Sequence, residues 1–114
     1  MNFDNNKPIY IQIADNICEK VLSGALEEGG RIPSVREWAA EIGVNPNTVA
    51  RSYDLLVERG VIFIQRGIGY FTVENARETV KESERQKFID EDLPQLLKRA
   101  ELLGIDIRKY LPSE

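Results

Sequence analysis

The feature that most constrains the fold of this chain is a turn of about three residues between two helix signals. Ser34, with Glu37 three residues later, has the pattern of a reciprocal N-terminal cap, and Gly43 is placed to end the helix that follows. Asn45-Pro46 then begins the next helix with a capping residue and a proline at the first helical position. Two helices joined by so short a turn containing glycine predict a helix-turn-helix motif.

An amphipathic helix precedes this motif. From Tyr10 to Leu22 the apolar residues recur at intervals of three and four, so they share one stripe of a helix that Gly24 is placed to end. We expect the two helices of the motif to pack against that stripe through inner faces of their own. These faces comprise Val35, Trp38, Ala39 and Ile42 in the first helix and Val49, Ser52, Tyr53 and Leu56 in the second.

A β-hairpin is predicted after Gly60. Residues 61–65 and 70–73 are rich in β-branched and aromatic side chains, and glycines supply the turn between them. The expected fold is therefore mainly α with a small β-hairpin, a winged helix-turn-helix DNA-binding domain over residues 1–74. Four aromatic residues have an inward phase and are assigned to its core: Trp38, Tyr53, Phe63 and Phe71.

Residues 75–114 are expected to form a short helical tail. Asp92-Leu93-Pro94 indicates a helix start or a kink, because proline is tolerated without disruption only in a first turn. Gly104 breaks the run, and Asp106 is placed to cap a last short turn. The apolar residues of the tail have no obvious core of their own, so they either fold back on the winged domain or pack against a second copy. The leucines that favour dimerisation are Leu93, Leu96, Leu97 and Leu103.

The formal net charge of −4 argues at first against nucleic acid as a partner, but the charges are unevenly distributed. Residues 31–70 hold five basic and four acidic side chains, whereas residues 1–30 hold two and five, and residues 71–114 hold eight and ten. All five cations of the middle third are arginines, whose planar fork of donors suits phosphates and base edges. The middle third is therefore the candidate DNA-binding region.

The helix that begins at Asn45-Pro46 presents polar residues away from the core. With Val49 pointing inward and about 100° between successive residues, Asn47 and Arg51 face outward and Thr48 lies on the flank. This N-terminal corner enters the major groove in helix-turn-helix proteins. Arg51 suits a guanine edge, Asn47 an adenine edge, and Thr48 a phosphate or a thymine methyl. The alternative is that Asn47 and Thr48 only stabilise the helix start and that Arg51 is solvated.

The start of the preceding helix offers candidate phosphate contacts. Arg36 lies in its first turn, beside N-terminal amides that attract anions. The alternative for Arg36 is a surface ion pair with Glu37 or Glu41. Ser34 is first of all a cap, although its backbone can also meet a phosphate, and Arg31 is a weaker candidate.

The tip of the hairpin is the third candidate contact region. Gly67 and Gly69 allow the backbone to come close to a phosphate or to the minor-groove edge, and Arg66 can enter that groove. The alternative is a plain turn with a solvated arginine.

The sequence offers no residues for catalysis, for a metal or for a cofactor. It contains no histidine, and the lone Cys18 can form no intramolecular disulfide. No basic N-terminal segment precedes an apolar run, and no stretch approaches the roughly 18 apolar residues of a membrane span. We expect a cytoplasmic protein with no cofactor, no membrane partner and no enzymatic activity.

Several motifs resemble those of the GntR family of bacterial transcriptional regulators. They are PIYIQI at 8–13, IPSVREWA at 32–39, GVNPNTVAR at 43–51, ERGVI at 58–62 and RGIGYF at 66–71. The resemblance covers residues 8–73 and implies a homodimer that binds a palindromic operator in double-stranded DNA. The DNA-contacting positions that it implies are Arg36, Asn47, Thr48, Arg51, Arg66, Gly67 and Gly69.

The length of the tail indicates one subfamily of this family. Only about 40 residues follow the wing, so the ligand-binding domain that most members carry is expected to be absent. The short tail is similar to that of the YtrA subfamily, whose two C-terminal helices make the dimer and whose members often control transporter operons. The leading hypothesis is a sequence-specific repressor. A rival hypothesis is a winged helix that recruits a protein partner through its acidic faces, and no residue identifies a small-molecule effector.

Overall fold

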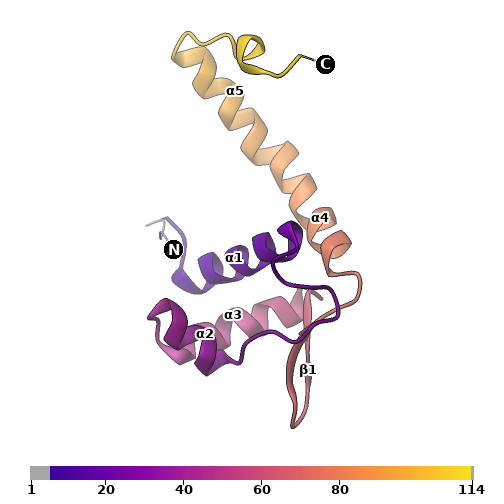
Figure 1. Ribbon diagram of the computed structural model, residues 1–114. Coiled ribbons are helices and arrows are strands. Elements are labelled where there is room, and N and C mark those ends of the chain that lie inside the picture. Colours follow the sequence, from indigo (N-terminus) through magenta and orange to yellow (C-terminus); the bar gives the residue numbers. More distant parts are fainter. Residues whose placement is uncertain (1–5, 114) are drawn as a thin grey trace. The chain divides into compact units, whose positions relative to one another are not determined.

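The computed structural model describes residues 6–113 and divides the chain into two compact units, with the division after Lys81. The first unit, the winged unit, contains three helices and a hairpin followed by the start of a fourth helix (Figure 1). Its elements are α1 (Ile9–Ser23), α2 (Val35–Ile42), α3 (Pro46–Glu58), β1 (Ile62–Gln65), β2 (Gly69–Thr72) and the first residues of α4 (Ala76–Lys87). This order of elements confirms the predicted winged helix-turn-helix fold.

The helices of the motif begin and end where their local signals predicted. The Ser34 hydroxyl accepts a hydrogen bond from the N–H of Glu37 at 3.1 Å, and the Glu37 carboxylate accepts one from the N–H of Ser34 at 3.0 Å. Gly43 ends α2 with φ 70°, and the side-chain oxygen of Asn45 accepts from the N–H of Asn47 at 2.8 Å. The turn between α2 and α3 is therefore fixed at both ends by local contacts.

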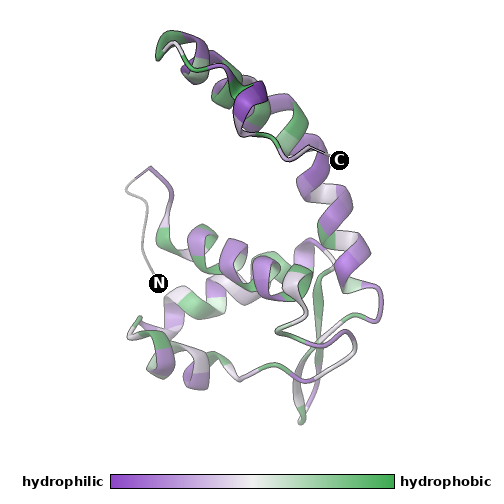
Figure 2. Ribbon diagram, turned by 45° about the horizontal axis from the view of Figure 1, so that its top comes forward, coloured by the Kyte–Doolittle hydropathy of each residue, from purple (hydrophilic) through white to green (hydrophobic). Residues whose placement is uncertain are grey.

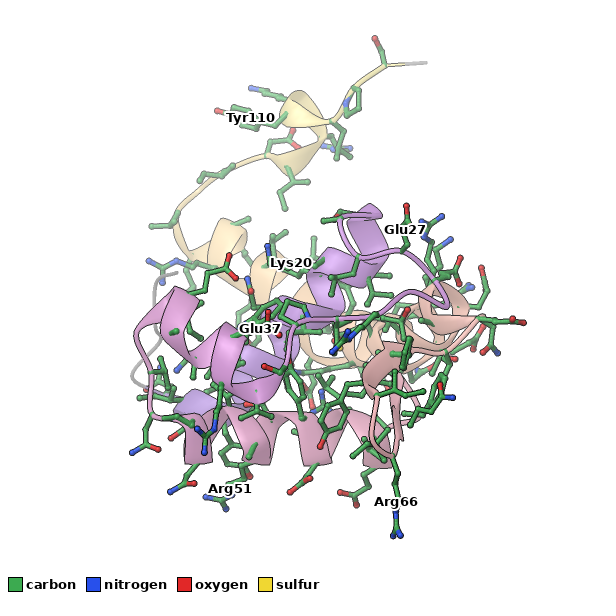
Figure 3. The ribbon with its side chains drawn as sticks, turned by 60° about the horizontal axis from the view of Figure 1, so that its bottom comes forward. Lys20, Glu27, Glu37, Arg51, Arg66 and Tyr110 are labelled. Carbon is green, nitrogen blue, oxygen red and sulfur yellow. The ribbon has the colours of Figure 1, made fainter. Side chains whose placement is uncertain are left out.

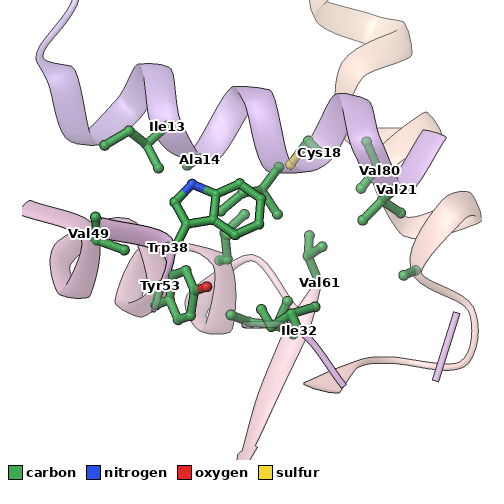
Figure 4. Packing of buried hydrophobic residues seen from close by; sticks show 14 of the residues in the cluster. Ile13, Ala14, Cys18, Val21, Ile32, Trp38, Val49, Tyr53, Val61 and Val80 are labelled. Carbon is green, nitrogen blue, oxygen red and sulfur yellow. The ribbon is translucent and has the colours of Figure 1, made fainter. Parts of the chain in front are cut away.

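The core of the winged unit lies between α1, α2 and α3 (Figure 4). The apolar stripe of α1 packs against Trp38 of α2 and Tyr53 of α3, both buried as predicted. The Tyr53 hydroxyl donates to the carbonyl oxygen of Pro33 at 2.6 Å, and burial raises the pKa of Tyr53, so this hydroxyl stays a donor at neutral pH. The hydroxyl of fully buried Ser52 donates to the carbonyl oxygen of Tyr10 at 2.7 Å. Helix α3 is thus hydrogen-bonded to α1 and to the segment before α2.

The hairpin is an antiparallel ribbon whose base joins the rest of the unit. Ile62 lies opposite Thr72 in the register of the two strands. The segment before α2 runs along β2: the N–H of Ile32 donates to the carbonyl oxygen of Tyr70, and the N–H of Thr72 donates to that of Gly30, both at 3.0 Å. These bonds anchor the wing near the start of α2.

The prediction that Phe63 lies in the core is wrong. Its side chain is 43% exposed, Phe71 across the ribbon is only half-buried, and the two rings stack with their centroids 5.7 Å apart. Only the base of the ribbon meets the core, and Ile62 and Val61 are buried there. Beyond the base, no second layer from residues 6–113 covers the face that the two phenylalanines share. Their inward phase in the sequence could not indicate that this layer is missing.

The beginning of α4 completes the core of the winged unit. Ala76 and Val80 are fully buried, and Val80 lies close to Val21 of α1 (Figure 4). The N–H of Arg77 donates to the carboxylate of Glu28 at 3.1 Å. About the first turn and a half of α4 therefore packs against the rest of the winged unit.

The second unit, the tail unit, is helical. It contains the rest of α4, a π-helical turn η1 (Phe88–Asp92), α5 (Leu93–Leu102) and a 3₁₀ turn η2 (Ile107–Tyr110) that Asp106 caps as predicted. The N–H of Leu93 donates to the carbonyl oxygen of Phe88, five residues earlier. This wider turn comes just before Pro94, whose ring would crowd the carbonyl four residues earlier in a regular α-helix. The sequence predicted a helix start or a kink at this proline, and the structure has a π-helical turn just before it.

The tail unit leaves much of its apolar surface exposed. No residue of α5 is buried, and α5 and η2 line a groove of about 610 Å³. Figure 2 colours the ribbon by hydropathy and shows hydrophobic stretches in green along this unit. Its exposed aliphatic and Phe side chains are Phe88, Ile89, Leu93, Leu96, Leu97, Leu102, Leu103, Ile105 and Leu111. So much apolar surface is unusual on a small monomeric protein and is typical of an interaction surface.

Removal of the Tyr53 hydroxyl tests how firmly α3 is tied to the segment before α2. Tyr53→Phe keeps the packing of the ring but leaves the Pro33 carbonyl without its donor, so we expect the free energy of unfolding to fall by about 1–2 kcal/mol. Tyr110→Phe is the control, since Tyr110 is 78% exposed and should contribute little. Urea denaturation followed by circular dichroism measures both, and wild-type stability of Tyr53→Phe would contradict this hydrogen bond.

Candidate DNA-binding surface

The first two turns of α3 carry the predicted base-reading residues. Asn47 and Arg51 are exposed and Thr48 is half-buried, whereas Val49 and Tyr53 on the other side of the helix are fully buried. Within residues 6–113 the side chains of Asn47 and Arg51 make no hydrogen bond or ion pair. Their donors are therefore available to a ligand that approaches this end of α3.

The guanidinium of Arg51 contacts the ring of Tyr10. The guanidinium carbon lies over that ring, 4.1 Å from its centroid. Tyr10 belongs to the first turn of α1 and is half-buried. The sequence pattern places Tyr10 at the first position of the buried stripe and so misses this contact. An aromatic residue at the end of an apolar stripe has the same pattern whether its ring is covered by the core or by an arginine.

Arg36 is exposed in the first turn of α2. Throughout the described part of the chain it makes no ion pair, so the alternative partners Glu37 and Glu41 do not engage it. Arg36 therefore keeps its full charge beside the N-terminal end of a helix, where backbone N–H groups also favour an anion.

Glu37 and Ser34 are occupied by the cap of α2. Hydrogen bonding from Ser34, through its backbone N–H and then its hydroxyl, holds the pKa of Glu37 below its ordinary value, and the charge of Arg31 lowers it further. The carboxylate therefore stays ionised at neutral pH. The charge of the Glu37 carboxylate offsets the positive charge of Arg31 more than that of Arg36.

The wing tip is a tight turn closed by a hydrogen bond at 3.0 Å from the N–H of Ile68 to the carbonyl oxygen of Gln65. Arg66 is exposed at this tip, and Gly67 has φ 78°, a conformation that favours glycine. A Cβ on Gly67 would meet nothing within 4 Å, so backbone conformation rather than crowding requires glycine there.

The structure brings Arg31 and Gly69 together on the wing, at the end of β2 that is next to the tip. A Cβ on Gly69 would lie 3.1 Å from Nε of Arg31, and φ 148° at Gly69 is itself unfavourable for other residues. Arg31 also forms a β-bridge with Phe71 on the same strand. Arg31 is thus positioned by the wing, although the sequence places it just before α2.

Arg51 of α3 and Arg66 of the wing point out of the same side of the winged unit (Figure 3). Asp54 and Glu58, which are exposed further along α3, give the second half of that helix the opposite charge. The cationic end of α3 is therefore its N-terminal half. A helix end and a hairpin tip that present arginines on one side are suited to a DNA groove and the phosphates beside it.

Comparison with known proteins identifies the family. Residues 9–72, more than half of the chain, match the family described as bacterial regulatory proteins, gntR family. The chain belongs to the gntR family. This family consists of DNA-binding transcriptional regulators and not of enzymes. The match spans α1 to β2, so it includes every element that carries a candidate contact residue.

Individual gntR-family proteins resemble most of the chain. This chain is 39% identical over 105 residues to the HTH-type transcriptional repressor YtrA of Bacillus subtilis, and the match covers 92% of this chain and 80% of that protein. A GntR family transcriptional regulator from Listeria monocytogenes has a similar structure, with a TM-score of 0.76 and 32% identity over 95% of this chain and 93% of its own. YtrA from Sulfolobus acidocaldarius matches with a TM-score of 0.64 and 34% identity, over 82% of this chain and 94% of its own. The likeness therefore includes the tail.

Three further features of residues 6–113 concern metal ions, membranes and the single cysteine. That range contains no group of three or more metal-ligating side chains suited to hold an ion. None of the helices in it combines the length and the apolar character needed to cross a bilayer. Cys18 is buried on the stripe of α1, as its position in the sequence predicted.

The cap of α2 predicts a pH dependence of stability. Since the folded-state pKa of Glu37 lies below its ordinary value of 4.5, its ionised form stabilises the fold above that pH, and the contribution is lost as the pH falls through the folded-state pKa. Glu37→Gln keeps a capping side chain but not the charge. We expect the wild type to melt above Glu37→Gln at pH 7 and the gap to shrink below pH 4.5. Thermal melts with Glu41→Gln as control measure it, and a gap constant with pH would contradict the assignment.

Proposed function

We propose that this gntR-family protein is a homodimeric transcriptional repressor that binds a palindromic DNA operator. The observation that carries the proposal is the common orientation of Arg51 and Arg66, with the donors of Arg51 available and the carboxylates of α3 further along the helix. The family supports DNA as the target. The name of the Bacillus subtilis relative, a transcriptional repressor, supports the direction of control.

In this proposal the N-terminal half of α3 enters the major groove. Arg51 donates two hydrogen bonds to a guanine edge, Asn47 pairs with an adenine edge, and Thr48 contacts a phosphate or a thymine methyl. Asp54 and Glu58 require α3 to tilt, so that its second half stays away from the phosphates.

The remaining contacts hold the protein on the backbone of the duplex. Arg36 and the first turn of α2 bind one phosphate, with the cap residue Ser34 beside it. The wing binds the adjacent backbone and minor-groove edge, where Arg66 enters the groove. The contact residues assigned to these two regions are Ser34 and Arg36 in the first, and Arg31, Arg66, Gly67 and Gly69 in the second.

Dimerisation is assigned to the tail. We propose a winged DNA-binding domain over residues 1–74 and a helical dimerisation tail over residues 75–114. The exposed apolar side chains of α5 and the groove beside it support this division, because a second copy would cover them. Two winged units then bind half-sites about one helical turn apart. Since a bacterial regulator meets its operator in the cytoplasm, we expect the protein there, and the YtrA-like tail favours a transporter operon as its target.

Operator binding by arginine variants tests the DNA-binding assignment. With a duplex selected from random DNA by the wild type, we expect Arg51→Ala to lose about 1–3 kcal/mol of binding free energy and most base preference at one position. Arg36→Ala should weaken binding of all sequences and reduce the slope of log affinity against log salt by about one per protomer. Fluorescence anisotropy at several salt concentrations measures both effects.

The matched control is Arg59→Ala, which removes an arginine at the other end of α3 that pairs with Asp15 at 3.6 Å. It should bind close to wild-type strength. Unchanged affinity of Arg51→Ala and Arg36→Ala at fixed salt would overturn the residue assignments. Failure of the wild type to select any duplex would favour the rival role as a protein-binding module.

A charged substitution in the tail tests dimerisation in the full chain. Leu96 of α5 and Leu103, the residue that follows α5, line the groove and are 56% and 60% exposed. We expect the double variant Leu96→Glu and Leu103→Glu to be a monomer by light scattering, because two carboxylates would be buried in the interface. Lys98→Glu, on the polar side of α5, is the control and should remain a dimer. A double variant that stays dimeric would place the interface elsewhere.

A further inference from the structure

The contact between Arg51 and Tyr10 joins an exposed cation of α3 to an aromatic ring of α1. At 4.1 Å from guanidinium carbon to ring centroid, it is within the range of a cation–π interaction. No carboxylate within residues 6–113 is paired with Arg51. Among the hydrogen bonds, ion pairs and ring contacts of residues 6–113, the Tyr10 ring is therefore the partner that restrains the Arg51 side chain.

A ring and a carboxylate restrain an arginine with different consequences. A carboxylate would neutralise the guanidinium and use its N–H donors, so DNA would have to displace it. An aromatic face attracts the charge without neutralising it and without satisfying the five N–H donors. Tyr10 therefore limits the rotamers of Arg51 while leaving the chemistry of the guanidinium available.

The position of the Tyr10 ring is itself tied to α3. The carbonyl oxygen of Tyr10 accepts the hydrogen bond of buried Ser52 at 2.7 Å, and Ser52 follows Arg51 in the chain. The backbone of Tyr10 is thus fixed relative to the residue next to Arg51. Movement of α1 against α3 would strain or break this bond.

We propose that Tyr10 is a positioning residue for base recognition, whose ring pre-orients Arg51 toward the major groove. The proposal rests on the assignment of Arg51 as a base-reading residue under the proposed function. An arginine has much rotational freedom to lose on binding, so a side chain held in place before it meets DNA binds more tightly and accepts a wrong base less readily. Tyr10 thereby acts on specificity without touching DNA.

A double-mutant cycle tests the proposal, with the duplex that the wild type selects from random DNA as the probe. We expect Tyr10→Leu to weaken binding about two- to fivefold and Tyr10→Phe, which keeps the ring, to bind like the wild type. In an Arg51→Ala background Tyr10→Leu should have no further effect. On duplexes with single-base changes, Tyr10→Leu should reduce the preference at the same position as Arg51→Ala.

The outcomes separate this inference from the function on which it rests. If Arg51→Ala lowers affinity but Tyr10→Leu weakens binding equally in both backgrounds, Tyr10 has only a structural role and the inference is overturned. Wild-type binding and base preference in Tyr10→Leu would also overturn it. If Arg51→Ala itself changes nothing, the assignment of Arg51 fails first. Tyr10→Met, which fills the site without a ring, replaces Tyr10→Leu if that variant does not fold.

Discussion

Two buried hydroxyl groups on consecutive residues determine how α3 is presented. Ser52 donates to the carbonyl oxygen of Tyr10 at 2.7 Å, and Tyr53 donates to that of Pro33 at 2.6 Å. The first bond joins α3 to α1 and the second joins it to the segment before α2, so rolling or sliding of α3 would strain or break both bonds. The side of α3 that carries Arg51 is outward because the other side is held in this way.

The charge of the protein is consistent with recognition by a few well-placed groups. A net charge of −4 would hinder a protein that relied on general attraction to DNA, but hydrogen bonds to base edges need orientation more than total charge. Arg36, Arg51 and Arg66 form no ion pair with a carboxylate of residues 6–113, and Arg51 contacts an aromatic ring instead of an acid. Such a surface is expected to favour specific over nonspecific binding.

The sequence predicted those parts of the fold that depend on neighbouring residues. Ser34, Gly43 and Asn45 fix the ends of α2 and α3 through contacts within a few positions, so their types alone were informative. Phe63 could not be predicted, because its burial depends on whether another layer covers the wing. Nor could the contact between Tyr10 and Arg51 be predicted, because Tyr10 fits the apolar stripe of α1 and the arginine lies 41 positions away in the sequence. The DNA contacts themselves remain predictions from helical phase and turn geometry.

The structure of the protein bound to a duplex that it selects from random DNA would show whether α3 and the wing contact DNA as proposed. We expect the N-terminal half of α3 to lie in the major groove, with Arg51 still over the ring of Tyr10 and within hydrogen-bond distance of a base edge. We also expect Arg66 at the adjacent backbone or minor groove. A complex in which α3 faces away from the DNA, or in which Arg51 contacts neither base nor phosphate, would contradict the proposed function.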